Sequence, residues 1–230
     1  MTILITRPHK HAIPTAKKIL QIGLQPLMIP LLKIKYIDVE IPQAGYDGLV
    51  ISSQNAVAAI SANKSLFRTP IFVVGEQSKA LLAQHGFRNI KYVAENIQLL
   101  QMKLATFPNH KFLYICGRHI TVNLEELIGV ERLKQLVVYE AEAIIELTTK
   151  QIELINKKVR IVLFYSARTA KIWWRLCKKH ELKMEGKTAI CISADVAKEI
   201  YQLNWRFEPM VAVNPTEAAM FAYVQEITKP

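Results

Sequence analysis

Cysteine is scarce in this sequence, which contains only Cys116, Cys177 and Cys191 among its 230 residues. The three are not spaced as pairs, and a small, odd number of cysteines is typical of a reducing compartment rather than of a disulfide-stabilised secreted domain. No apolar run reaches the roughly 18 residues of a membrane-spanning helix. The opening residues, MTILITRP, indicate a strand and not a signal segment. We therefore expect a cytoplasmic protein that makes no use of a membrane.

Common ligand motifs are missing as well. The sequence has no GxGxxG after a predicted strand and no GxxxxGKS/T, so it gives no support to a nucleotide phosphate loop. It has no HExxH or CxxC pattern of the kind that binds zinc, and no GxSxG nucleophile elbow. A metal site is therefore not expected.

Acidic residues are few compared with basic ones. Lysine and arginine number 30 and aspartate and glutamate 19, which gives a formal net charge of +11. Such an excess favours anionic partners, namely nucleic acid, acidic membranes or small polycarboxylates, but it also fits a basic solvated surface without any partner. The basic residues are scattered, so no basic run marks a nucleic-acid-binding tail.

What the sequence does contain is a repeated pattern of strand, serine and helix. Residues 49–60, LVISSQNAVAAI, return in altered form as IVLFYSARTAKIWW at residues 161–174. In each copy an apolar run indicates a buried strand, and a serine, Ser53 or Ser166, precedes a helical pattern as a helix N-cap does. The chain therefore contains two related halves.

The repeat extends further and sets the domain organisation. Residues 71–82 correspond to 189–200, where a helix is expected from about Asp195 to Asn204, and the strand at 112–118 corresponds to the one at 3–7. The second half therefore takes its last strand from the start of the chain. We expect two parallel-sheet α/β domains of flavodoxin-like type, because strands alternate with helices throughout. One is discontinuous (1–34 plus 142–230) and one is inserted (38–136), and the linkers 35–37 and 137–141 form a two-stranded β ladder.

Ligands of open parallel sheets bind beyond the carboxyl ends of the strands, where helix N-termini offer free N–H groups to anions. The side chains and glycines expected at those ends are the candidate site residues: Arg7, Ser53, Gly75, Ser78, Gly117, Arg118, Ser166, Ser193 and Thr216. The alternative for Ser53, Ser166 and Thr216 is that they only cap helices. Tyr139 lies on the expected ladder, where it is either a site residue or simply a β-forming aromatic.

The order of these segments resembles uroporphyrinogen-III synthases. The resemblance covers nearly the whole chain and includes ILITRP at 3–8, YDGLVISSQNAV at 46–57, FVVGEQSKALLAQHGF at 72–87, VVYEAEA at 137–143, VLFYSARTA at 162–170 and VNPTEAAM at 213–220. It implies closure of linear hydroxymethylbilane to uroporphyrinogen III with inversion of ring D and loss of water, in haem biosynthesis. It also implies a monomeric enzyme without metal or organic cofactor. The implied substrate is a linear tetrapyrrole with an acetate and a propionate on each ring. The net positive charge of the protein would attract such a polyanion.

The resemblance also assigns roles. Tyr139 matches a tyrosine placed to assist departure of the hydroxyl group, and Ser53, Ser78, Ser166 and Thr216 match positions that hold substrate carboxylates, whereas Arg7 matches an arginine of unassigned role. The turn ISADVA at 192–197 departs from the usual IGPTTA and places Asp195 near a polyanion, which is unfavourable unless that charge is screened. Two rival hypotheses stay open at this point: a weakened homologue that only binds a polyanion, and a basic nucleic-acid-binding protein.

Overall fold

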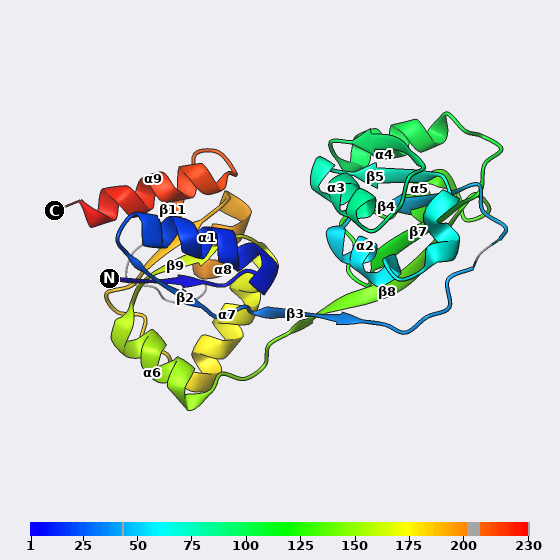
Figure 1. Cartoon of the computed structure of the whole chain (residues 1–230). Helices are drawn as coiled ribbons and strands as arrows, with labels where there is room; N and C mark the ends of the chain where they lie inside the picture. Colours follow the sequence, from blue (N-terminus) through cyan, green and yellow to red (C-terminus); the bar gives the residue numbers. More distant parts are fainter. Residues whose placement is uncertain (43, 202–207, 230) are drawn as a thin grey trace. The chain divides into compact units, whose positions relative to one another are not determined.

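The computed structural model describes residues 1–42, 44–201 and 208–229. The chain divides into two compact units: unit 1 comprises Met1–Lys33 and Glu142–Pro230, and unit 2 comprises Ile34–Ala141 (Figure 1). The chain passes from one unit to the other inside β3 (Leu32–Tyr36) and again inside β8 (Leu133–Ala143), and these two strands are neighbours in one sheet. At either end of this pairing, the Ile37 amide donates to the Val138 carbonyl (2.9 Å) and the Ile144 amide to the Leu31 carbonyl (3.0 Å).

Unit 2 contains a sheet in the order β3-β8-β7-β4-β5-β6, in which the pairs from β8 to β6 are parallel. Its elements between the two crossings are β4 (Gly48–Ile51), α2 (Gln54–Ile60), the 3-10 helix η1 (Lys64–Arg68), β5 (Ile71–Val74), α3 (Glu76–Gln84), β6 (Ile90–Ala94), α4 (Ile97–Ala105), β7 (Phe112–Gly117) and α5 (Leu124–Ile128).

Unit 1 contains a parallel sheet in the order β11-β10-β9-β1-β2. Its elements are β1 (Thr2–Ile5), α1 (His9–Gln21), β2 (Gln25–Met28), α6 (Thr149–Lys158), β9 (Val159–Phe164), α7 (Ala167–His180), β10 (Thr188–Cys191), α8 (Ala194–Tyr201), β11 (Met210–Val211) and α9 (Glu217–Thr228). The helix expected from Asp195 is α8, and its expected end at Asn204 lies outside the described residues.

The two sheets repeat one topology. The order β6-β5-β4-β7-β8 in unit 2 matches β11-β10-β9-β1-β2 in unit 1 when β4 is set against β9 and β7 against β1. The N-terminal strand does complete the second half, because Leu4 of β1 lies opposite Val162 of β9. The predicted fold class, two parallel-sheet α/β domains related by an internal repeat, is therefore confirmed.

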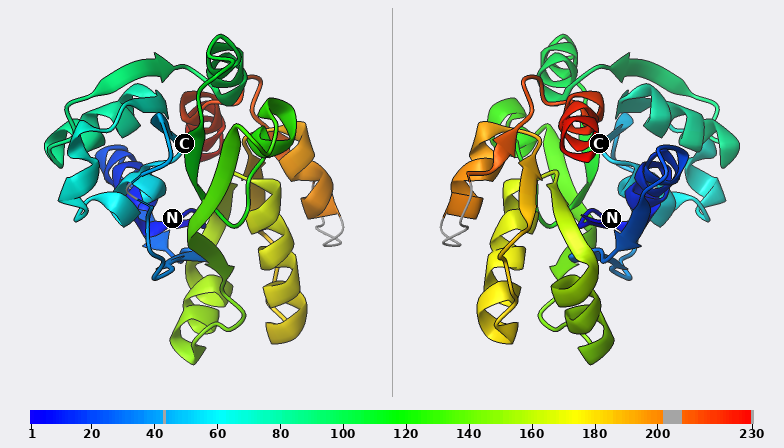
Figure 2. Two further views of the ribbon diagram at one scale, coloured as in Figure 1. Left: turned by 90° about the vertical axis from the view of Figure 1, so that its right-hand side faces the viewer. Right: turned by 90° about the vertical axis from the view of Figure 1, so that its left-hand side faces the viewer.

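Both faces of each sheet are covered by helices (Figure 1 and Figure 2). Successive residues of a strand point to opposite faces, so the continuous apolar strands need helices on both sides. In unit 1, Leu4 and Val162 pack with α7 on one face while Ile3 and Ile161 pack with α1 and α9 on the other. In unit 2 the corresponding faces pack against α2 and α3, and against α4 and α5.

The three cysteines and Trp173 belong to these cores. All three cysteines are free and buried, and burial raises the pKa of the Cys116 thiol to about 11. Such thiols are poor nucleophiles at neutral pH, so they serve packing. Of the adjacent tryptophans on α7, Trp173 is fully buried, and Trp174 is half-buried with the Lys178 ammonium 4.1 Å from its ring centroid. No helix in the described part of the chain has the length and apolarity needed to cross a membrane.

Candidate functional site

Unit 2 gathers three of the candidate positions at the carboxyl ends of neighbouring parallel strands. Ser53 follows β4, Gly75 follows β5 and Gly117 ends β7, and both β5 and β7 pair with β4. Ser53 is the N-cap of α2, since its side chain accepts a hydrogen bond from the Asn55 amide (3.2 Å). Gly75 precedes α3 with φ +83°, a conformation that side chains with a Cβ atom rarely adopt.

Tyr139 lies directly against Gly117. The two residues are partners in the β7–β8 register, and a Cβ atom added to Gly117 would lie 2.6 Å from Cζ of the Tyr139 ring. That distance is far inside van der Waals contact, so the ring can occupy this place only because residue 117 lacks a side chain. The glycine in the strand thus sets where the phenol lies.

A cavity of about 210 Å³ opens beside this pair. Its polar lining comprises Ser52, Ser53, Tyr114, His119, Thr121 and Tyr139, and its apolar lining comprises Val74, Ile97 and Ile120, with Gly117 between them. Of the candidates named from the sequence, Ser53, Gly117 and Tyr139 meet here. The cavity therefore combines a phenol, hydroxyl donors and a helix N-terminus at the edge where α/β sheets bind ligands.

Tyr114, which was not expected from the sequence, also lines this cavity, beside Ser52 just after β4. The Tyr114 hydroxyl and the Ser52 hydroxyl are 2.6 Å apart. Tyr114 is 2% exposed, and burial raises its pKa to about 12, so it stays protonated and can donate to Ser52. The signal available in the sequence was a polar-tipped aromatic inside the apolar strand FLYICG, since a buried tyrosine hydroxyl needs a partner.

The other unit 2 candidates have partners of their own. Ser78 is 5% exposed within α3, and its amide donates to the Gly75 carbonyl (3.1 Å). Arg118 is exposed, and its Nε lies 2.7 Å from Oε2 of Glu140. Neither residue lines the cavity.

In unit 1 the candidates again follow neighbouring strands. Arg7 lies just after β1, Ser166 just after β9, Ser193 after β10 and Thr216 after β11. Ser166 caps α7 by accepting from the Thr169 amide, and Thr216 caps α9 by accepting from the Ala219 amide, both at 3.2 Å. The Ser193 carbonyl accepts from the Ala197 amide (3.1 Å). The predicted capping is confirmed for Ser166 and Thr216.

Arg7 is held in a network centred on Glu217. Its Nη1 is 3.1 Å from Oε1 of Glu217 and 3.4 Å from the Thr15 hydroxyl, and its guanidinium lies 4.1 Å from the ring centroid of Tyr165. Lys18 also pairs with Glu217. Burial by itself would raise the pKa of Glu217, but hydrogen bonds from Lys18 and Thr15 outweigh it and hold that pKa below its usual value. The network joins β1, α1, β9 and α9, so Arg7 has a structural role here.

The charge of Asp195 in the turn at 192–197 is screened. The Lys198 ammonium lies 2.9 Å from Oδ1 of Asp195, and this hydrogen bond lowers the pKa of the carboxyl. Val196, which stands where related turns have threonine, is 3% exposed and belongs to the apolar core. The residues that differ from the usual turn therefore contribute a buried apolar side chain, Val196, and a local ion pair between Asp195 and Lys198.

Taken together, fold and site define an α/β protein with two repeated units, each of which presents capped helix starts and hydroxyl groups at the carboxyl edge of its sheet. A family model described as uroporphyrinogen-III synthase HemD matches residues 14–222. The chain belongs to that family.

Solved structures agree with this at the level of the fold. The structure is similar to that of uroporphyrinogen-III synthetase from Helicobacter pylori, with a TM-score of 0.68, 21% identity, and coverage of 98% of this chain and 99% of that chain. It is also similar to a mutant uroporphyrinogen III synthase from the extremely thermophilic bacterium Thermus thermophilus, with a TM-score of 0.55, 14% identity and full coverage of both chains. No curated protein matches the sequence.

Proposed function

We propose that this protein is a uroporphyrinogen-III synthase, a lyase of haem biosynthesis that closes hydroxymethylbilane to uroporphyrinogen III with inversion of ring D and loss of water. The observation that carries the proposal is the family match over residues 14–222, together with Tyr139 in the lining of a largely polar cavity. We further propose that it acts in the cytoplasm, as a monomer and without a cofactor, on this small-molecule substrate and not on nucleic acid.

The cavity is suited to one end of the substrate. Its volume of about 210 Å³ lies below the roughly 300–1,000 Å³ of pockets that enclose a whole drug-sized ligand, so it can take one substituted pyrrole and not four. In this proposal the ring that carries the hydroxymethyl group enters the cavity. The carboxylates of the remaining rings then lie along the exposed helix starts and basic side chains outside it.

Tyr139 would act on the leaving hydroxyl group. A phenol O–H is both donor and acceptor, so it can donate to the departing oxygen as the C–O bond of the hydroxymethyl group breaks and water leaves. The loss of water leaves an azafulvene on the ring that carried this group. The substituted carbon of ring D, the pyrrole at the other end of the bilane, attacks the azafulvene and forms a spiro intermediate. This intermediate fragments and recloses with ring D inverted. Because the Tyr139 ring is packed against Gly117, the phenol is already in a fixed position before the reaction begins, and no entropy is lost in positioning it.

Ser52 and Ser53 would hold a carboxylate beside the reacting ring. Either hydroxyl of the Tyr114–Ser52 pair can donate, and when Tyr114 is the donor the Ser52 proton is free to point into the cavity. Ser53 brings the first N–H groups of α2 to the same place. Hydroxyl and amide donors that are already fixed in position stabilise charge without further reorganisation.

The test is an assay with freshly prepared hydroxymethylbilane, which closes unaided to the type I isomer. We expect the purified chain to consume the bilane faster than buffer does and to yield the type III isomer, with heat-denatured protein as the control. Type I product alone, formed at the uncatalysed rate, would reject the proposed function.

A further inference from the structure

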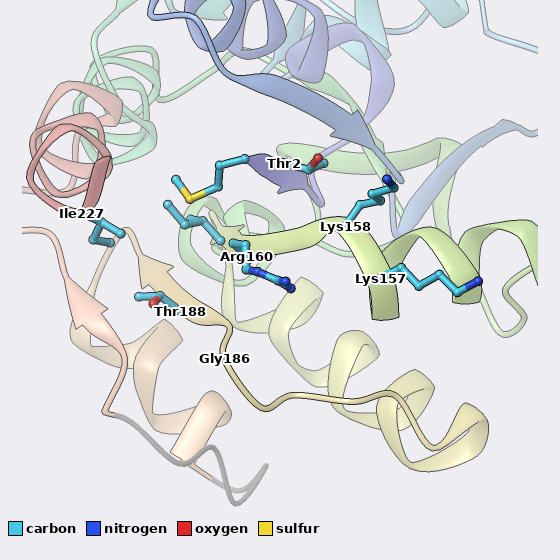
Figure 3. Close-up of a pocket in the computed structure, with 9 residues that line it drawn as sticks. Thr2, Lys157, Lys158, Arg160, Gly186, Thr188 and Ile227 are labelled. Carbon is cyan, nitrogen blue, oxygen red and sulfur yellow. The ribbon is translucent and has the colours of Figure 1, made fainter. Parts of the chain in front are cut away.

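A second cavity, of about 570 Å³, opens at the amino-terminal edge of the unit 1 sheet. Its lining includes Thr2, the first residue of β1, Thr188, the first residue of β10, and Arg160 near the start of β9 (Figure 3). The candidate residues of unit 1 follow the other ends of the same strands, so this cavity lies at the opposite edge of the sheet. The function proposed above gives it no role.

The charged lining of this cavity is entirely positive. Among the residues that the structure describes, it consists of Lys157, Lys158 and Arg160 and includes no carboxylate side chain. Lys157 is paired with Glu153 (2.7 Å), whereas within the described ranges neither Lys158 nor Arg160 forms an ion pair. The lysines in the last turn of α6 suit the negative end of the helix dipole, whereas Arg160 belongs to the strand β9.

The Arg160 guanidinium has more N–H donors than its hydrogen bond within the protein uses. Its Nη1 donates to the Val159 carbonyl at 3.3 Å, and a guanidinium carries five N–H donors in all. Its side chain is exposed, and Figure 3 shows it between Lys158 and Thr188. A carboxylate can therefore reach it from solvent and form the paired hydrogen bonds that guanidinium and carboxylate geometry favours.

The other side of the cavity is apolar. Met1, Ile161 and Ile227 belong to its lining, and Figure 3 shows Ile227 beside Thr188, on the side away from Lys158. The volume falls within the roughly 300–1,000 Å³ of pockets for organic ligands. A ligand with an apolar group and an anionic group could contact the apolar side of this cavity and, at the same time, the cations of Lys158 and Arg160.

Lys187 adds an independent reason for an anion here. It follows the lining residue Gly186 and is 1% exposed, and its Nζ lies 3.4 Å from the Asn156 carbonyl oxygen. Burial and the nearby positive charge of Arg160 lower the pKa of Lys187. An anion on Arg160 would reduce this repulsion between like charges.

We propose that this cavity binds an organic carboxylate with an apolar body, in which the carboxylate contacts Arg160 and Lys158 and the body contacts Ile161 and Ile227. The site is separate from the one that acts on the tetrapyrrole. Its ligand is recognised by one anionic end and one apolar end, and an inorganic anion satisfies only half of that recognition.

Three small probes test this in the full chain: hexanoate has both features, hexan-1-ol has only the apolar body, and acetate has only the charge. Titrations followed by amide NMR spectra should show saturable hexanoate shifts at Thr2, Gly186 and Thr188. We expect hexanoate to bind about tenfold more tightly than either other probe, since each lacks one favourable contact. Equal affinity of hexanoate and hexan-1-ol, or hexanoate shifts confined to other residues, would overturn the proposal.

A matched pair of variants locates the charge that matters. Arg160→Gln should weaken hexanoate binding about tenfold, the effect of losing one charge-assisted hydrogen bond. Lys198→Gln in the same unit should leave it unchanged, because Lys198 pairs with Asp195 (2.9 Å) and does not line this cavity. Both side chains are exposed, so both variants should fold. Unchanged binding to the Arg160 variant would refute the site, whatever the outcome of the bilane assay.

Discussion

At the scale of single residues, Gly117 and Tyr139 form the pair on which the proposed chemistry depends. The ring of Tyr139 lies where a side chain on residue 117 would have to be. The hydroxyl contributes the chemistry and the ring contributes the packing, so the two contributions can be separated by substitution.

Removal of the hydroxyl should slow the reaction and spare the fold. Tyr139→Phe keeps the ring against Gly117 and loses one donor, so we expect turnover to fall by about severalfold to a hundredfold, the range for one positioned proton donor. The thermal midpoint should change little. Steady-state assays and circular dichroism measure the two, and an unchanged turnover would remove Tyr139 from the mechanism.

A side chain at residue 117 should do the opposite and move the ring. Gly117→Ala places a methyl group 2.6 Å from Cζ of Tyr139, so the ring must shift, and we expect turnover to fall at least about tenfold, as misplacement of a catalytic group does. Gly129→Ala in the same unit is the control, since its added methyl group meets nothing within 4 Å. That variant should lose about 1–3 kcal/mol of stability, because φ +101° and ψ 134° are backbone angles that residues with a Cβ atom rarely adopt, but it should keep its turnover. Equal turnover of both variants would contradict the account of the pair.

At this scale the helix N-caps could be predicted from the sequence, but only some of the residues that line the unit 2 cavity could be. Ser53, Ser166 and Thr216 each precede a helical pattern, and capping is a local interaction that the sequence displays directly. The Tyr114–Ser52 hydrogen bond joins residues of two strands that are brought together by sheet pairing. No local pattern marks such a contact, which is why Tyr114 was missed.

At the scale of elements, the Glu217 network ties the start of α9 to α1, β1 and β9. The carboxylate accepts hydrogen bonds from Thr15 (2.5 Å) and Tyr165 (3.2 Å) and pairs with Arg7 and Lys18. Three distant parts of the sequence, residues 7–18, Tyr165 and Glu217, thus share one charged group. Its protonation state should therefore affect the stability of unit 1.

Glu217→Gln should lower stability in a way that depends on pH. The folded pKa of Glu217 is below the ordinary 4.5, so its contribution is fully present above that pH and is lost as the pH falls through the folded pKa. We expect the variant to be less stable by about 1 kcal/mol at pH 7 and the difference to shrink below pH 4.5. Thermal midpoints between about pH 3 and 7 test this, with Glu226→Gln on the exposed face of α9 as the control. A difference that does not vary with pH would argue against the ionised network.

The elements themselves could be predicted because strand and helix signals alternate without long interruption. The pairing of β1 with β9 also followed from sequence, since the second half had no other strand to complete its sheet. The network around Arg7 could not be foreseen, because Glu217 is brought to Arg7 only by the packing of α9 against α1 and the sheet.

At the scale of the whole molecule, the net charge of +11 should act on substrate capture and not on chemistry. The implied substrate carries an acetate and a propionate on each pyrrole, so its attraction to a basic surface is screened by salt. We expect KM to rise about severalfold between roughly 50 mM and 500 mM sodium chloride while kcat changes little. A KM that is independent of salt would show that the surface charge has another use.

The isomer composition of the product tests the central claim most directly. Hydroxymethylbilane can close to the type I or the type III isomer, and the proposed enzyme must direct it to type III. Freshly prepared hydroxymethylbilane is divided among samples of increasing protein concentration, and the type III fraction of the product is measured in each. We expect that fraction to rise from near zero toward completeness for the wild-type chain, and at higher protein concentrations for Tyr139→Phe. A type III fraction that stays at its protein-free level at every concentration would contradict the account.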